Sequence, residues 1–175
     1  TIDPPPPVNS AGTTVLYSRE FYQDIKKRLN PGAVVQQWFF FDTTTQEHEL
    51  KYLLKSFIDE FPYGLVFSSP NKLGISIIAT TIPYEYNEEN LAKNLENPKV
   101  LADLSEWENT PKSAAEFTKM YIGTIDVLKK YVDTADSVTD NAPRSEYFLM
   151  RRILHSSPFI DNVELTDRLY SLVNN

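Results

Sequence analysis

A run of proline, residues 4–7, places the strongest constraint on how this 175-residue chain can fold. Proline fixes φ and has no backbone N–H to donate, so this run excludes both a helix and the interior of a sheet. The preceding Thr1-Ile2-Asp3 is typical of the carboxyl end of a β-strand that leads into an active-site loop. We therefore expect the chain to be the C-terminal half of an α/β enzyme domain, with the N-terminal half outside this sequence.

Composition argues against several classes of protein. The net charge of −7 is unlike that of a nucleic-acid binder, which usually has a basic face, and it suits cationic ligands. Because the chain has no cysteine, it has no disulfide and no thiolate-bound metal. No apolar run approaches the ~20 residues of a membrane span. We expect a cytoplasmic protein that holds no metal.

The pattern after the prolines predicts a helix followed by a strand. Ser18 is placed to cap a helix over residues 19–29, whose apolar side chains recur with the helical period. Asn30-Pro31-Gly32 ends this helix. Residues 34–41 are a nearly continuous apolar run, which is typical of a strand buried on both faces.

The next unit repeats this order. Thr44 and Glu47 form a Thr-x-x-Glu capping box, and an apolar stripe at helical spacing follows them. Residues 65–68 and 75–80 predict an antiparallel strand pair. We expect one sheet in which strand 75–80 lies antiparallel between the other two. The fold class is therefore α/β, the closing half of a methyltransferase-type Rossmann-like sheet.

The rest of the chain predicts a mostly helical extension. We expect residues 1–82 to form the half-sheet and residues 83–175 to pack on it. Ser113 and Glu116 give a second capping box, which begins a helix to about Val132. Other helices are predicted within residues 87–104, 144–154 and 163–173.

Several short motifs, taken in order, resemble the spermidine/spermine synthase family of aminopropyltransferases. They are Asp3-Pro4, Leu16-Tyr17-Ser18-Arg19-Glu20-Phe21-Tyr22, Leu29-Asn30-Pro31-Gly32, Val35-Gln36-Gln37-Trp38 and Thr139-Asp140-Asn141-Ala142-Pro143 with Glu146-Tyr147. The family transfers an aminopropyl group from decarboxylated S-adenosylmethionine, its co-substrate, to a polyamine. The resemblance covers residues 3–80 and a short stretch near residue 140.

The resemblance implies three substrate-binding residues. Asp3 corresponds to the second acid of the family's Asp-x-x-Asp-Pro signature, which holds the amine, and Gln37 to the glutamine that ends the family's fifth strand. Asp140 lies in the Thr-Asp-Asp-x-Pro-like stretch. The family's first acid, usually credited as the base, would precede Thr1. We therefore expect no catalytic base here, no bound cofactor and no activity from the isolated chain.

The sequence departs from the family at two places. Prolines replace a glycine-containing loop, and the loop around Asn71 lacks the tyrosine that many spermidine synthases carry there. Both departures leave the amine acceptor open. They also leave open two other classes of protein: an S-adenosylmethionine-dependent methyltransferase, and a catalytically silent relative that acts as a binding or assembly module.

Each candidate residue also has a structural interpretation. Asp3 before proline is a common turn former, Gln37 can fill the seam between a sheet and a helix, and Asp140 can be an ordinary loop residue. Glu47-His48-Glu49 lacks the His-Glu-x-x-His spacing of a zinc site, and the helix dipole explains acids in a first turn.

The expected partners follow from the half-domain interpretation. They are a small polyamine and a polypeptide that covers the free edge of strand 34–41. That polypeptide is either the N-terminal segment or a second copy of the chain. We expect neither nucleic acid nor a membrane.

Overall fold

The computed structural model describes residues 12–40, 46–72, 74–146, 150, 153–154 and 158–173. Within these residues the chain has a mixed α/β fold, as predicted. None of the helices in these ranges is both long enough and apolar enough to cross a membrane.

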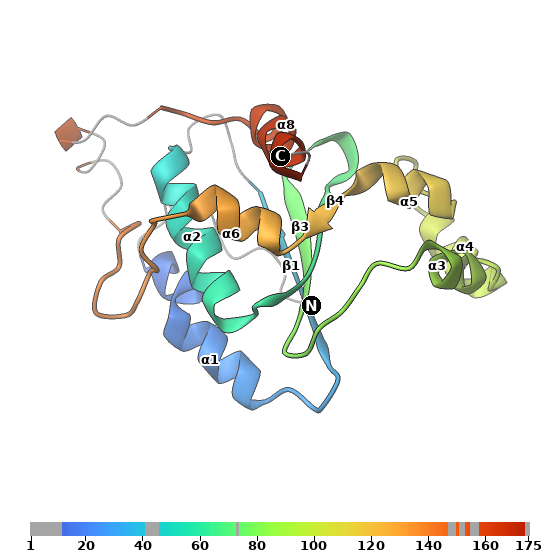
Figure 1. Ribbon diagram of the computed structural model, residues 1–175, viewed down its shortest axis with the longest axis horizontal. Coiled ribbons are helices and arrows are strands. Elements are labelled where there is room, and N and C mark those ends of the chain that lie inside the picture. Colours follow the sequence, from blue (N-terminus) through green and yellow to red (C-terminus); the bar gives the residue numbers. More distant parts are fainter. Residues whose placement is uncertain are drawn as a thin grey trace.

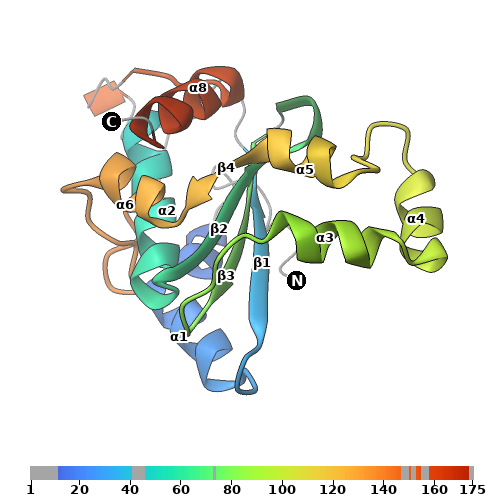
Figure 2. The same ribbon diagram turned by 45° about the vertical axis from the view of Figure 1, so that its right-hand side comes forward.

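The sheet has the strand order β1-β3-β2-β4 (Figures 1 and 2). The strands are β1 (Val34–Phe39), β2 (Tyr63–Ser68), β3 (Ile75–Thr80) and β4 (Tyr121–Thr124). Because β3 pairs antiparallel with both β1 and β2, those two strands run parallel to each other. This arrangement confirms the prediction that the third strand lies antiparallel between the first two.

Within the described residues, helices cover one face of this sheet, which we call the inner face. Figure 1 shows α1 (Arg19–Lys27), α2 (Glu47–Glu60) and α6 (Asp126–Val132) on the same side of the strands. The C-terminal helix α8 (Asn162–Val173) packs against α6 and β4. The hydrophobic core therefore lies between the inner face and these helices.

Aromatic side chains fill the middle of that core. Phe57 of α2 is fully buried and meets Tyr22 of α1 edge to face, with ring centroids 5.1 Å apart. The Phe39 ring of β1 lies 5.7 Å from Phe57 in a similar geometry. These contacts join α1, α2 and β1 around one aromatic ring.

The first helix begins where the sequence predicts. The Ser18 hydroxyl accepts a hydrogen bond from Phe21 N at 3.2 Å, and α1 ends at Lys27, two residues before the predicted end. This cap satisfies one of the N–H groups that have no partner within the helix.

The predicted cap of the second helix is wrong. The helix begins at Glu47, and its capping box is made by Gln46 and Glu49, with Gln46 N donating to Glu49 Oε2 at 3.2 Å. Thr44 lies outside the described residues. The physical reason is a tertiary contact: Glu47 N donates to Pro158 O at 3.0 Å, which fixes the chain's entry into the helix.

The prediction that the first strand is buried on both faces is also wrong. Val35, Gln37 and Phe39 are buried on the inner face, but Val34 is 54% exposed on the outer one. The reason is that β1 lies at an edge of the sheet and helices cover only its inner face. An apolar run cannot show from sequence which of its faces is covered.

The predicted helix from Ser113 to about Val132 is interrupted by a strand. The Ser113 cap is confirmed, since its hydroxyl accepts from Glu116 N at 3.3 Å at the start of α5 (Ala114–Met120). The chain then forms β4 and resumes as α6. β4 pairs with β2 and buries Ile122 on the inner face, and this pairing overrides the helical spacing.

An arm of three helices projects from the outer side of the sheet (Figures 1 and 2). It contains α3 (Glu88–Leu95), α4 (Pro98–Ser105) and α5, so short helices within residues 87–104 are confirmed. Tyr86 anchors the arm by stacking on Tyr121 of β4, with ring centroids 4.6 Å apart.

The two C-terminal helices that the sequence predicts have different outcomes. The prediction over residues 163–173 is confirmed by α8, which begins one residue earlier. Of the predicted helix over residues 144–154, residues 144–146 form a turn, and most of the others lie outside the described residues.

A buried carboxylate fastens α1 to α2. The Glu60 side chain is 8% exposed, and its Oε1 accepts from Arg19 Nη2 at 2.9 Å and Gln23 Nε2 at 3.0 Å. The Lys26 ammonium lies 3.6 Å from Oε2. Burial alone would raise the pKa of Glu60, but these donors and cations outweigh it and hold the pKa below its usual value.

Gly64 should tolerate no side chain. Its φ is +152°, and a Cβ there would lie 2.3 Å from the carbonyl oxygen of Ile78. We expect Gly64→Ala to lower the free energy of unfolding by about 2–4 kcal/mol in urea titrations. Gly32→Ala is the matched control, because its φ is also positive but no atom lies within 4 Å. Gly32→Ala should lower the free energy of unfolding by only about 1 kcal/mol. Equal losses in the two variants would contradict a steric cause at Gly64.

Glu60→Gln should change how stability depends on pH. Because the pKa of Glu60 is depressed in the folded protein, its contribution is complete above the unfolded pKa and is lost as the pH falls through 4.5 and below. At neutral pH we expect the variant to lose about 1–2 kcal/mol of unfolding free energy. The loss is no larger because the partner cations are partly exposed and water screens their charges. The variant and the wild type should converge in acid. The exposed Asp24→Asn is the control. Lys27 also lowers the pKa of Asp24, but that ion pair lies in solvent, so its loss should change the pH profile much less.

Candidate functional site

The carboxyl ends of β1 and β2 lie at the same end of the sheet, because the two strands are parallel. Ligands of open α/β sheets bind at this end of the strands, which we call the carboxyl edge. A 3₁₀ helix, η1 (Thr13–Tyr17), lies there, with the Tyr17 ring centroid 6.4 Å from that of Phe39. Burial raises the pKa of Tyr17 to about 12, so its hydroxyl stays protonated.

The segment from Val138 to Glu146 is fixed at the same end of the sheet by hydrogen bonds that backbone N–H groups donate. Gly12 N, just before η1, donates to Glu146 Oε1 at 2.8 Å. Asp140 N donates to Glu20 Oε2 at 3.1 Å, and Arg19 N donates to Val138 O at 2.9 Å. These bonds bring together two parts of the chain more than a hundred residues apart.

The sequence-predicted site residues fall in different environments. The Asp140 side chain is exposed at the surface, on the loop held by Glu20. Gln37 is fully buried on the inner face of β1, close to the Tyr22 hydroxyl. Asp3 lies outside the described residues. The structure therefore shows an exposed carboxylate and a buried amide, and their role in amine binding stays a prediction.

Gln37 and Tyr22 form a buried polar pair in the core. Burial raises the pKa of the Tyr22 hydroxyl well above its usual value, and the neighbouring Gln37 amide opposes this only in part. Although the two groups are close, neither reaches hydrogen-bonding geometry with a described atom. This position agrees with the structural interpretation, in which Gln37 fills the seam between the sheet and α1.

Sequence reasoning missed two buried hydroxyls at the same edge. Thr14 of η1 and Ser145 are each 1% exposed, and the side-chain oxygen of each has no hydrogen-bond partner among the described residues. The bond from Gly12 to Glu146 joins the segments that carry them. A hydroxyl can both donate and accept, so each of these side chains could bond to a further polar group. We call these two residues the Thr14–Ser145 pair.

Arg144, the residue before Ser145, adds a cation to the same segment. Its guanidinium pairs with Asp136 at 2.8 Å and lies 5.7 Å above the ring of Tyr52. Its Nε is buried and has no acceptor. Sequence alone could not identify these residues. Thr14 and Ser145 are of residue types that are common in loops, and Arg144 looks like an ordinary surface arginine.

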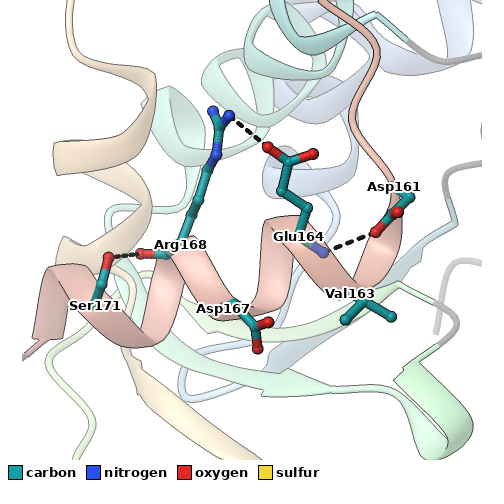
Figure 3. Close-up of a pocket in the computed structure, with 6 residues that line it drawn as sticks. All are labelled: Asp161, Val163, Glu164, Asp167, Arg168 and Ser171. Carbon is teal, nitrogen blue, oxygen red and sulfur yellow. Dashed lines mark hydrogen bonds and ion pairs between the residues drawn. The ribbon is translucent and has the colours of Figure 1, made fainter.

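A hollow along α8 has a different character (Figure 3). Its charged groups already have partners: Arg168 binds Glu47 at 2.9 Å and Glu164 at 2.6 Å, and Asp161 Oδ1 accepts from Glu164 N at 2.8 Å. Burial tends to raise the pKa of Glu47, but Lys51 and Arg168 lower it below its usual value. This network fastens α8 to α2, and we assign it a structural role.

The acids at the start of α2 are likewise accounted for by local structure. Glu47 lies in this ion network, and Glu49 completes the capping box with Gln46. In the parts of the chain that the structure describes, no three His, Cys, Asp or Glu side chains gather as a metal site would require.

Comparisons with protein-family models, with curated proteins and with solved structures found no match to this chain.

The Thr14–Ser145 pair predicts an unusual stability result. Because each hydroxyl is buried without a partner, we expect Thr14→Val and Ser145→Ala to leave the free energy of unfolding unchanged or to raise it by up to about 1 kcal/mol. Ser56→Ala is the control, since its buried Oγ accepts from Val138 N at 2.7 Å. That variant should lose about 1–2 kcal/mol in the same urea titrations. Comparable losses at Thr14 and Ser145 would show that these hydroxyls are bound within the protein.

Proposed function

We propose that this chain forms part of a spermidine synthase-like aminopropyltransferase, as the closing half of its methyltransferase-type Rossmann-like sheet. The observation that carries the proposal is the strand order. β1 and β2 are parallel, β3 lies antiparallel between them, and α1 and α2 cover the same face. This is the order that the resemblance implies for strands five to seven of such a domain.

The position of the family-like motifs gives independent support. The stretch that contains Arg19 and Glu20 and the stretch that contains Asp140 are far apart in sequence, yet two hydrogen bonds join them. Segments that share one binding site must meet in this way. They meet at the carboxyl edge of the parallel strands, where ligands of open α/β sheets bind.

Aminopropyl transfer makes limited demands on this part of a protein. The amine nitrogen attacks the carbon next to the sulfonium, a C–N bond forms, the C–S bond breaks and methylthioadenosine leaves. The attacking amine must be deprotonated and in line, while carboxylates hold the remaining ammonium groups. We assign the holding role to Asp3 and Asp140, and we assign no nucleotide-binding residue to this chain. The net charge of −7 favours a cationic acceptor.

Asp3→Asn tests this assignment in an active protein that carries the chain. A charge-assisted hydrogen bond to an ammonium contributes about 1.5–3 kcal/mol, so the KM for the amine should rise about tenfold or more. The KM for decarboxylated S-adenosylmethionine should stay nearly unchanged, because the variant loses an interaction that binds only the amine. Initial rates at varied putrescine or spermidine, and separately at varied decarboxylated S-adenosylmethionine, would measure both constants.

Asp103→Asn is the matched control, because it removes the same charge from an exposed position on the arm. It should leave both constants unchanged. Equal losses for the two substrates, or none, would contradict the role of Asp3. Methyl transfer from S-adenosylmethionine would favour the methyltransferase alternative, and no turnover of either compound would favour the silent module.

A further inference from the structure

We propose that the tip of the arm is a docking surface for a basic amphipathic helix of another polypeptide. This surface, which we call the tip surface, consists of Val100, Leu101 and Leu104 of α4 together with Trp107. Figures 1 and 2 both show α4 at the end of the arm that lies farthest from the sheet. The inference does not depend on the proposed function, because it uses only side chains of the arm.

Local signals, and not burial, define the start of α4. Pro98 occupies the first turn, where proline suits a helix, and the Asn97 side chain caps the helix by accepting from Lys99 N at 3.0 Å. Yet no residue of this eight-residue helix is fully buried. Because a helix this short is marginal in water without packing, a contact that covers its apolar side would stabilise it.

Apolar side chains recur along one side of α4. Val100, Leu101 and Leu104 follow the helical spacing, and each is only partly buried. Trp107, three residues after Leu104, is 73% exposed. The turn beyond α4 fixes its backbone, because its carbonyl oxygen accepts from Thr110 N at 3.4 Å and from Thr110 Oγ1 at 2.8 Å. An exposed tryptophan that continues a half-covered apolar stripe is typical of a protein-binding surface.

The charge around this stripe favours a basic partner. Residues 96–108 contain four acidic residues and one basic residue, Lys99, and all five are exposed. The structure gives none of these acids an ion pair with a described residue. Glu106 and Glu108 flank Trp107 in the sequence, so a lysine or arginine could meet both the indole ring and a carboxylate. The same charges repel a second copy of this chain, whose net charge is −7.

A basic amphipathic helix is complementary to both features of the tip surface. Its apolar side chains would cover the stripe on α4, and its lysine or arginine side chains would meet the acids beside Trp107. A free polyamine supplies only the charge and leaves the apolar side chains in water. An acidic polypeptide supplies only the apolar contact. The combination of stripe and charge therefore selects a basic helix over either of these.

Titration of the full chain with a synthetic peptide of leucine and lysine tests the proposal. The leucines recur at helical spacing, whereas a scrambled peptide of the same composition keeps the charge without an apolar face. We expect calorimetry to show saturable binding of one helical peptide per chain, which weakens as salt is added. The scrambled peptide should bind at least tenfold more weakly. Equal binding of the two peptides would mean that charge alone attracts them and would overturn the proposal.

Two variants of the tip should weaken the binding of the helical peptide. Trp107→Ser removes the exposed ring and should cost at least tenfold in affinity, while Glu108→Gln should cost about threefold. Both positions are exposed, so folding should survive, and circular dichroism would check it.

Each of these variants has a matched control elsewhere in the chain. Tyr84→Ser removes a ring that is 51% exposed but lies before the arm, and Asp133→Asn removes an exposed charge at the end of α6. Neither control should change the affinity. Losses equal to those at Trp107 and Glu108 would mean that the peptide does not recognise the tip surface.

Fluorescence provides a second readout at the tip surface itself. The chain has two tryptophans, so Trp38→Phe leaves Trp107 alone to report. Its emission should shift to the blue as the helical peptide binds, in step with the calorimetric curve, because the peptide excludes water from the ring. Spermidine is the polyamine probe and should neither cause this shift nor displace the peptide. Peptide binding without the shift, or displacement by spermidine at a similar concentration, would overturn the proposal.

Discussion

The antiparallel insertion of β3 is the constraint on which the rest of the structure depends. Because β3 hydrogen-bonds to both β1 and β2, it holds these two strands parallel and brings their carboxyl ends to one edge. The close approach after the β2–β3 turn needs glycine, since a Cβ on Gly74 would lie 2.1 Å from Phe39 O. That contact fixes the end of β1, beside which η1 and the loop held by Glu146 meet. The position of the candidate site thus follows from one strand pairing.

Sequence patterns predicted those elements whose signals are local. The Ser18 and Ser113 caps, the strands around β2 and β3 and the helix α8 all have such signals, and the structure has them where expected. The failures involve contacts between distant segments. Tyr121 and Ile125 fit a helical stripe that continues from α5, but pairing with β2 turns this stretch into β4. An apolar sequence likewise could not reveal that β1 has only one covered face, because the covering helices come from elsewhere in the chain.

The candidate site was less predictable than the fold. Resemblance directed attention to Gln37 and Asp140, and the structure places one in the core and the other on the surface. The Thr14–Ser145 pair has no sequence signal, because serine and threonine are frequent in loops, and burial without a hydrogen-bond partner, which these two share with Ser69, cannot be predicted from sequence. Such burial has a cost in free energy that folding alone does not repay. A site that binds a polar ligand there would recover that cost on binding, which is why we give the pair more weight than the fully paired hollow along α8.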